Sequence, residues 1–139
     1  MIDIEPQLNI RRITEWDERI AAHVYIPAGE ECGIEPEKRN LKNPNYYLFA
    51  GFAGDDMVSV LSLHTSLHGC TRFDYILTAP SHRGKGYAKE MQLFATDFCR
   101  KHALPHCFTW YASPYSAKIG YASGFRQAFA VETGSAFCE

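Results

Sequence analysis

Glycines and cations gather in one short stretch of the chain, a pattern that suits binding of an anion. The residues concerned are Arg83, Gly84, Lys85, Gly86 and Lys89. Glycine lets backbone N–H groups approach a bound anion without a Cβ in the way, and the start of a helix adds the positive end of its dipole. The stretch therefore predicts a phosphate site. A glycine-rich turn whose cations are simply solvated is the alternative.

The spacing of these glycines excludes two common nucleotide-binding loops. The dinucleotide fingerprint G-x-G-x-x-G needs three glycines and a downstream acid, and the Walker loop needs G-x-x-x-x-G-K-[ST]. Neither pattern occurs in this stretch. A phosphate site here must be of another kind.

The residues around the glycines predict a strand that runs into a helix. Residues 71–79 are strand-like and end at Pro80, which cannot donate to a strand ladder. Beyond the glycines, side chains recur at three- and four-residue steps, which predicts a helix from about 85 to 102 with one buried face. They are Ala88, Met91, Ala95, Phe98, Cys99 and His102. A further strand is expected at 106–112, parallel to 71–79 through a right-handed crossover.

The remaining elements complete a mixed sheet flanked by helices. A first strand is expected within 2–12 and a helix at 14–25, with Thr14 as its N-cap. The other expected elements are a loop at 27–45, strands at 46–53 and 58–63 joined by the turn Gly54-Asp55-Asp56, a connection at 64–70, a short helix at 116–123, and strands at 125–132 and 136–138. The order is β-α-ββ-β-α-β-α-β(β).

Composition favours one ordinary globular domain over residues 1–139. Hydrophobic residues make up 46% and charged residues 22% of the 139 residues, and the net charge is −2, which argues against nucleic acid as a partner. No apolar run approaches the roughly 18 residues of a membrane span, and the acids among residues 1–5 do not suit a secretory signal. Five cysteines without a C-x-x-C pair predict neither a disulfide framework nor a zinc site. We expect a cytoplasmic protein.

Two segments together resemble the GNAT superfamily of acetyl-CoA-dependent N-acetyltransferases. The spacing Pro80-x-x-Arg83-Gly84-x-Gly86-x-Ala88 after a strand resembles the family's pyrophosphate loop, which contains R-x-x-G-x-A. Residues 113–125 look like its segment N-x-x-A-x-x-L-Y-x-x-x-G-F. The resemblance covers about residues 71–125 and implies a GNAT-like α/β fold, with a mixed, mostly antiparallel sheet, flanking helices and a central parallel pair of strands that splay apart.

The resemblance also implies where acetyl-CoA binds. The backbone of Ile76, Leu77 and Thr78 would pair with the pantetheine, and an N–H around Leu77 or Thr78 would stabilise the oxyanion. The pyrophosphate would lie over six consecutive residues, namely Arg83, Gly84, Lys85, Gly86, Tyr87 and Ala88. Ser113 stands where the family often has asparagine. No metal is implied.

Catalytic roles follow for two residues. Strand alternation places Asp74, Ile76 and Thr78 on one face, and Asp74 is the acid nearest the expected thioester. By resemblance Asp74 either acts as the base or binds a cationic acceptor; the alternative is a surface carboxylate paired with Arg72. His64 and His68, expected in the preceding turn, are weaker candidates.

Tyr121 is the expected donor of a proton to the departing thiolate. Aligning Gly124-Phe125 without a gap instead puts Gly120 at the family's tyrosine position, so solvent is the alternative donor.

The function implied is transfer of an acetyl group from acetyl-CoA to a primary amine by direct attack in a ternary complex. The alternative is a non-catalytic acyl-CoA-binding regulatory or interaction module, favoured by Gly120 and Ser113. The acids within 30–37 suit a cationic acceptor, although surface solvation explains them equally well. Because dimers are a family habit, a homodimer is compatible with the resemblance.

Overall fold

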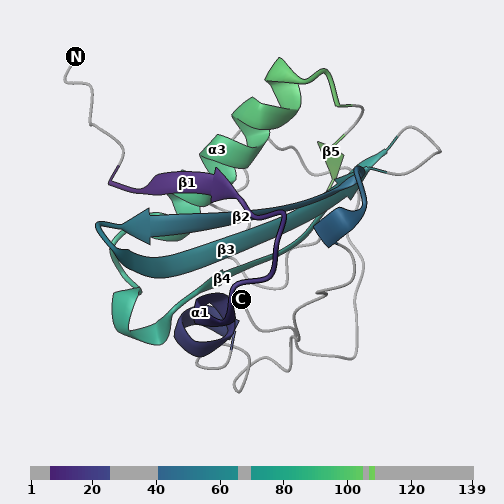
Figure 1. Cartoon of the computed structure of the whole chain (residues 1–139). Helices are drawn as coiled ribbons and strands as arrows, with labels where there is room; N and C mark the ends of the chain where they lie inside the picture. The colour runs from purple at the N-terminus through teal and green to yellow at the C-terminus, as the bar shows by residue number, and fades with distance from the viewer. Residues whose placement is uncertain (1–6, 26–40, 66–69, 105–106, 109–139) are drawn as a thin grey trace, which may run out of the picture.

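The computed structural model describes residues 7–25, 41–65, 70–104 and 107–108. In this part of the chain, five strands form one sheet in the order β1-β2-β3-β4-β5 (Figure 1). The strands are β1 (Asn9–Arg12), β2 (Tyr46–Ala53), β3 (Asp56–Thr65), β4 (Thr71–Thr78) and β5 (Cys107–Phe108). The predicted helix at 116–123 and the strands at 125–132 and 136–138 lie outside the described residues.

The sheet is mixed and mostly antiparallel, as predicted. The neighbours from β1 to β4 are antiparallel, whereas β5 runs parallel to β4. The parallel pairing joins Thr71 to Cys107 and Arg72 to Phe108. The predicted splaying of these two strands would occur beyond Phe108, outside the described residues.

Helices cover both faces of the sheet (Figure 1). On one face lies α1 (Glu18–Ile20), which continues into the π-helix η1 (Ala21–Tyr25). On the other face lies α3 (Tyr87–Lys101), preceded by the 3-10 turn η3 (Pro80–His82). The helix predicted at 85–102 is thereby confirmed to within two residues at each end.

Two apolar cores hold this arrangement together, one on each face. The first contains Ile20 and Val24 from the α1 face, both fully buried against Val60 of β3 and Leu77 of β4. The second packs α3 on the sheet and contains Leu61, Phe73, Tyr87, Met91 and Ala95. Successive residues of β3 enter opposite cores, which is the alternation that a strand buried on both faces requires.

The hairpin between β2 and β3 is confirmed, but β3 is longer than predicted. Ala53 pairs with Asp56 and Gly54 adopts a φ of +62°, which glycine tolerates at little cost. At its other end β3 continues to Thr65 because its ladders with β2 and β4 extend that far. The assignment of His64 to a connecting turn was therefore wrong, since His64 is a strand residue.

The first helix also begins later than predicted. Asp17, not Thr14, is the N-cap, and its Oδ1 accepts a hydrogen bond of 2.9 Å from the backbone N–H of Arg19. The hydrogen bond from the Arg19 side chain to this carboxylate lowers the pKa of Asp17. The earlier start was inferred from a cap-like residue type, whereas the side chain that reaches an orphan N–H decides where the helix begins.

Candidate active site

The loop between β4 and α3 takes a conformation that only glycine adopts easily. Gly84 has a φ of +79° and Gly86 a φ of +82°. A Cβ added at either position would meet nothing within 4 Å, so glycine is required by the backbone conformation rather than by lack of space. Gly86 is the N-cap of α3, which begins at Tyr87.

Backbone N–H groups of this loop have no backbone partner in the described part of the protein. Within the described residues, none of the N–H groups of residues 84–89 bonds to a backbone acceptor, and Glu90 is the first that does, with 3.2 Å to Gly86 O. The first N–H groups of any helix lack intrahelical partners. The positive φ values of the two glycines add further N–H groups to this set, which is the donor arrangement that a diphosphate needs.

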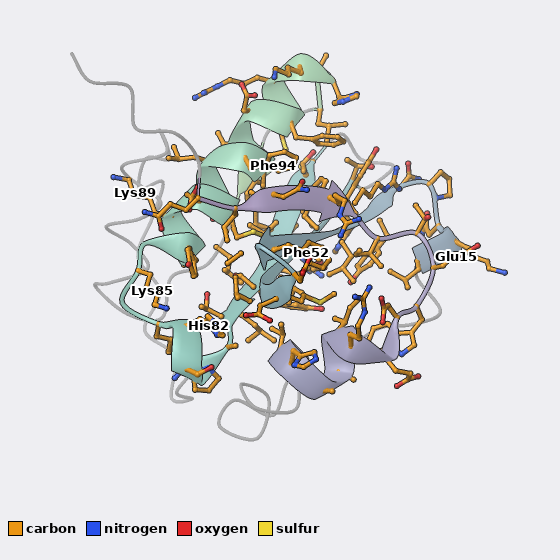
Figure 2. The ribbon with its side chains drawn as sticks, turned by 60° about the vertical axis from the view of Figure 1, so that its left-hand side comes forward. Glu15, Phe52, His82, Lys85, Lys89 and Phe94 are labelled. Atoms are coloured by element: carbon orange, nitrogen blue, oxygen red, sulfur yellow. The ribbon has the colours of Figure 1, made fainter. Side chains whose placement is uncertain are left out.

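Cations flank the same loop. Arg83, Lys85 and Lys89 are exposed. Figure 2 shows Lys85 on the loop before α3, Lys89 in the first turn of α3, and His82 on the turn before the loop. Neither lysine forms an ion pair with another described residue. The Arg83 Nε donates a hydrogen bond of 3.3 Å to Thr78 O, which ties the loop to the end of β4.

The end of β4 can offer its backbone, since its side chains are engaged elsewhere. Leu77 is 1% exposed in the core on the α1 face, while Ile76 packs against the core on the α3 face. The Thr78 hydroxyl oxygen lies 3.1 Å from that of Ser59, whose own hydroxyl donates to Leu77 O. A cofactor at this edge would therefore be met by main-chain groups.

Asp74 occupies a β-bulge in β4. Ser62 of β3 pairs with Tyr75 and the next residue, Leu63, pairs with Phe73, so Asp74 has no partner across this ladder. An extra residue of this kind breaks the period-two alternation. Accordingly, the Asp74 carboxylate contacts Ser62 and His64, whereas Ile76 packs toward α3. The prediction that Asp74, Ile76 and Thr78 share one face was therefore wrong.

The carboxylate of Asp74 is held by donors from two strands. Arg72 Nε lies 2.8 Å from Oδ1, and His64 Nδ1 lies 3.0 Å from Oδ2. The Ser62 hydroxyl donates to Oδ2 at 3.2 Å and lies 2.9 Å from the Tyr46 hydroxyl oxygen. Only 18% of the Asp74 side chain is exposed. The predicted pair with Arg72 is present, but as part of a half-buried cluster rather than an isolated surface pair.

Sequence reasoning missed two members of this cluster, Ser62 and Tyr46. Counting back from the turn at Gly54 would bring Tyr46 opposite Leu63, and only the register shift between Gly51 and Phe52 moves it opposite His64. Tyr121, Ser113 and His68, all singled out from the sequence, lie outside the described residues.

Among the residues described, no group of three His, Cys, Asp or Glu side chains is placed to hold a metal ion. The described helices include none with the length and apolarity needed to cross a membrane.

Comparison with solved structures shows a shared fold. An acetyltransferase from Bacillus subtilis in complex with CoA has a TM-score of 0.68 at 17% identity, covering 94% of this chain and 92% of that chain. An N-acetyltransferase, PaiA, from Thermoplasma acidophilum in complex with coenzyme A has a TM-score of 0.69 at 15% identity, covering 94% and 95%. An aminoglycoside acetyltransferase from an uncultured soil metagenomic sample, in complex with sisomicin, has a TM-score of 0.73 at 13% identity, covering 94% and 97%.

Sequence comparison gives the family. No curated protein sequence matches the chain. The sequence model of the acetyltransferase (GNAT) family matches residues 10–125, which is most of the chain and includes the glycine loop. With the sheet, the loop and the helix arranged as described, the chain belongs to the GNAT acetyltransferase family.

Proposed function

We propose that this protein is an N-acetyltransferase that transfers the acetyl group of acetyl-CoA to a primary amine by direct attack in a ternary complex. The observation that carries the proposal is the row of unused N–H groups at residues 84–89, set between exposed cations at the start of α3. Family membership and the solved relatives that contain CoA support it.

The loop would hold the pyrophosphate through its main chain. N–H groups of Gly84, Lys85 and Gly86, and of Tyr87 and Ala88 in the first turn of α3, would donate to its oxygens. Arg83 would add charge from the exposed side of the loop. Ser113, from the segment after β5, would complete this site.

The end of β4 would receive the pantetheine and the thioester. Ala79 N–H bonds to Val58 O at 2.8 Å, so by the alternation of an antiparallel ladder Ile76 and Thr78 direct their N–H groups away from β3. These groups would face the opening made by the splaying of β4 from β5. This alternation excludes Leu77, whose N–H points toward β3, and leaves the outward N–H groups of Ile76 and Thr78 as the candidate oxyanion donors. Loss of one such donor typically slows a reaction about 10²- to 10³-fold.

The thioester supplies an acyl carbon that an amine can attack, and the residues must move two protons. One leaves the amine nitrogen toward the cluster around Asp74. The other goes to the departing sulfur, from Tyr121 or from solvent. Holding both substrates in one pocket contributes further, since orientation alone can lower a barrier by several kcal/mol.

A cationic primary amine is the proposed class of acceptor. One solved relative was crystallised with sisomicin, and another with a bisubstrate analogue of CoA and acetylneamine. The cysteine pattern suggests that the reaction takes place in the cytoplasm.

Two measurements on the purified chain test the proposal. CoA should raise the thermal midpoint, and acetyl-CoA should release free thiol only when an amine is added. The panel consists of sisomicin, spermidine, lysine and a peptide with a free N-terminus. Absence of stabilisation by CoA would contradict the proposal. Stabilisation without amine-dependent thiol release would instead indicate a binding module.

A further inference from the structure

His64 is a partly exposed imidazole in the cluster around Asp74. It is the penultimate residue of β3, opposite Tyr46 of β2 and Arg72 of β4. Its Nδ1 lies 3.0 Å from Asp74 Oδ2, and a third of its side chain, 33%, is exposed. The ring is therefore anchored on one side and accessible on the other.

The contact with Asp74 sets the tautomer of the ring. An ionised carboxylate can only accept hydrogen bonds, so the Nδ1 atom must carry the proton that lies between them. In a neutral ring this leaves Nε2 with a free lone pair. Among the described residues, Nε2 has no hydrogen-bond partner.

Asp74 itself is poorly placed to accept a proton from a substrate. Oδ1 is engaged by Arg72, and Oδ2 is shared by His64 and Ser62. With both oxygens occupied by donors from the fold, the carboxylate is suited to orienting the imidazole. The same division of roles recurs in unrelated enzymes, where a carboxylate orients the imidazole through one ring nitrogen and the other ring nitrogen accepts the proton.

The cluster lies close along β4 to the backbone proposed to face the thioester, since Asp74 is two residues from Ile76. The last described pair between β4 and β5 is Arg72 with Phe108, and Asp74 follows two residues later. The bulge turns Asp74 to the α1 face, while the CoA loop leads into α3 on the other face. His64 would thus meet an acceptor that approaches from the α1 side of the sheet.

We propose that His64 Nε2 is the general base of the acetyl transfer and that Asp74 is its positioning residue; this inference rests on the proposed function. The attacking nitrogen enters as the neutral amine with a free lone pair, and as it forms its bond to the acyl carbon, one of its protons passes to Nε2. The C–S bond breaks and its electron pair leaves with sulfur, which takes a proton from Tyr121 or solvent. His64 then returns its proton to solvent, and Nδ1–H remains bonded to Asp74.

The decisive variant is His64→Gln, assayed with the panel amine that releases most thiol. General-base removal typically costs about 10²- to 10⁴-fold, and we expect a loss of that order in kcat with the KM for acetyl-CoA unchanged. The wild-type rate should fall toward acid pH, because a protonated imidazole cannot accept the proton of the amine. This dependence of the rate on pH should disappear in the His64→Gln variant. The described ionisable groups facing His64 are Asp74, Arg72 and Tyr46.

Two further variants separate catalysis from structure. Asp74→Asn should lower kcat less than His64→Gln does and should keep affinity for CoA. His102→Gln is the matched control, because His102 stacks on Phe98 at 4.1 Å between ring centroids at the end of α3. It should keep the wild-type rate and pH profile. Added imidazole should restore part of the activity of His64→Ala.

The outcomes distinguish this inference from the function on which it rests. A wild type that releases no thiol with any panel amine would overturn both. If the wild type is active and the His64→Gln variant keeps both the wild-type rate and its fall toward acid pH, the inference alone is overturned. A variant whose KM for acetyl-CoA rises while kcat holds would do the same. If His64→Gln fails to fold, the imidazole experiment on His64→Ala decides, and absence of rescue contradicts the role.

Discussion

At the scale of single residues, Gly86 carries the sharpest test of the CoA site. Its φ of +82° makes any side chain there strained, and an acid would add negative charge beside a bound diphosphate. Gly86→Glu should therefore abolish stabilisation by CoA, measured as the shift in thermal midpoint at saturating ligand.

Gly54 provides a matched control for that variant. It also has a positive φ, +62°, and open space around its Cβ position, but it lies in the β2–β3 hairpin away from the loop. Gly54→Glu should lower the thermal midpoint of the free protein and keep the CoA-induced shift. Equal loss of the shift in both variants would contradict the placement of the site.

Single-residue chemistry was only partly predictable from the sequence. The pairing of Asp74 with Arg72 follows from their spacing on one strand, and the structure contains it. The contacts of Asp74 with Ser62 and His64 depend on the register between β3 and β4, which one extra residue shifts. No local pattern in residues 71–79 marks that residue, so the face reached by the carboxylate could not be read from the sequence.

At the scale of elements, the close approach of α3 to the sheet depends on Gly51. A Cβ at this position would lie 2.8 Å from Met91 Sδ on α3 and 3.1 Å from Leu8 Cδ1. Gly51→Ala should cost about 1–3 kcal/mol in the free energy of unfolding, the usual range for overpacking. Chemical denaturation would measure it.

A double-mutant cycle shows whether Met91 causes that cost. In a Met91→Ala background the added methyl group has room, so Gly51→Ala should cost less there than in the wild type. Equal costs in the two backgrounds would contradict the contact as the cause.

Elements with strong periodicity or clear turn chemistry were predicted well. β2 matches its predicted bounds, and α3 follows from the spacing of its buried side chains. The first helix was misplaced because Thr14 and Asp17 are both residue types that cap helices, and the sequence does not show that the Asp17 carboxylate is the one that reaches a free N–H, that of Arg19. The length of β3 was underestimated because its last residues are polar and are held by two neighbouring strands.

At the scale of the whole molecule, the sheet separates the glycine loop from the cluster around Asp74. The loop that would bind the diphosphate leads into α3 on one face, and the cluster of Asp74 and His64 lies on the face covered by α1. The bulge in β4 places the Asp74 carboxylate on the α1 face, while the residues that follow it remain paired with β3 and lead to the glycine loop.

Backbone NMR during a CoA titration tests the central claim most directly. If main-chain amides hold the pyrophosphate, the ¹H–¹⁵N signals of Gly84, Gly86 and Ala88 should shift most, and they should saturate together with the thermal stabilisation. Largest shifts at another surface, with residues 84–89 unmoved at saturating CoA, would contradict the account.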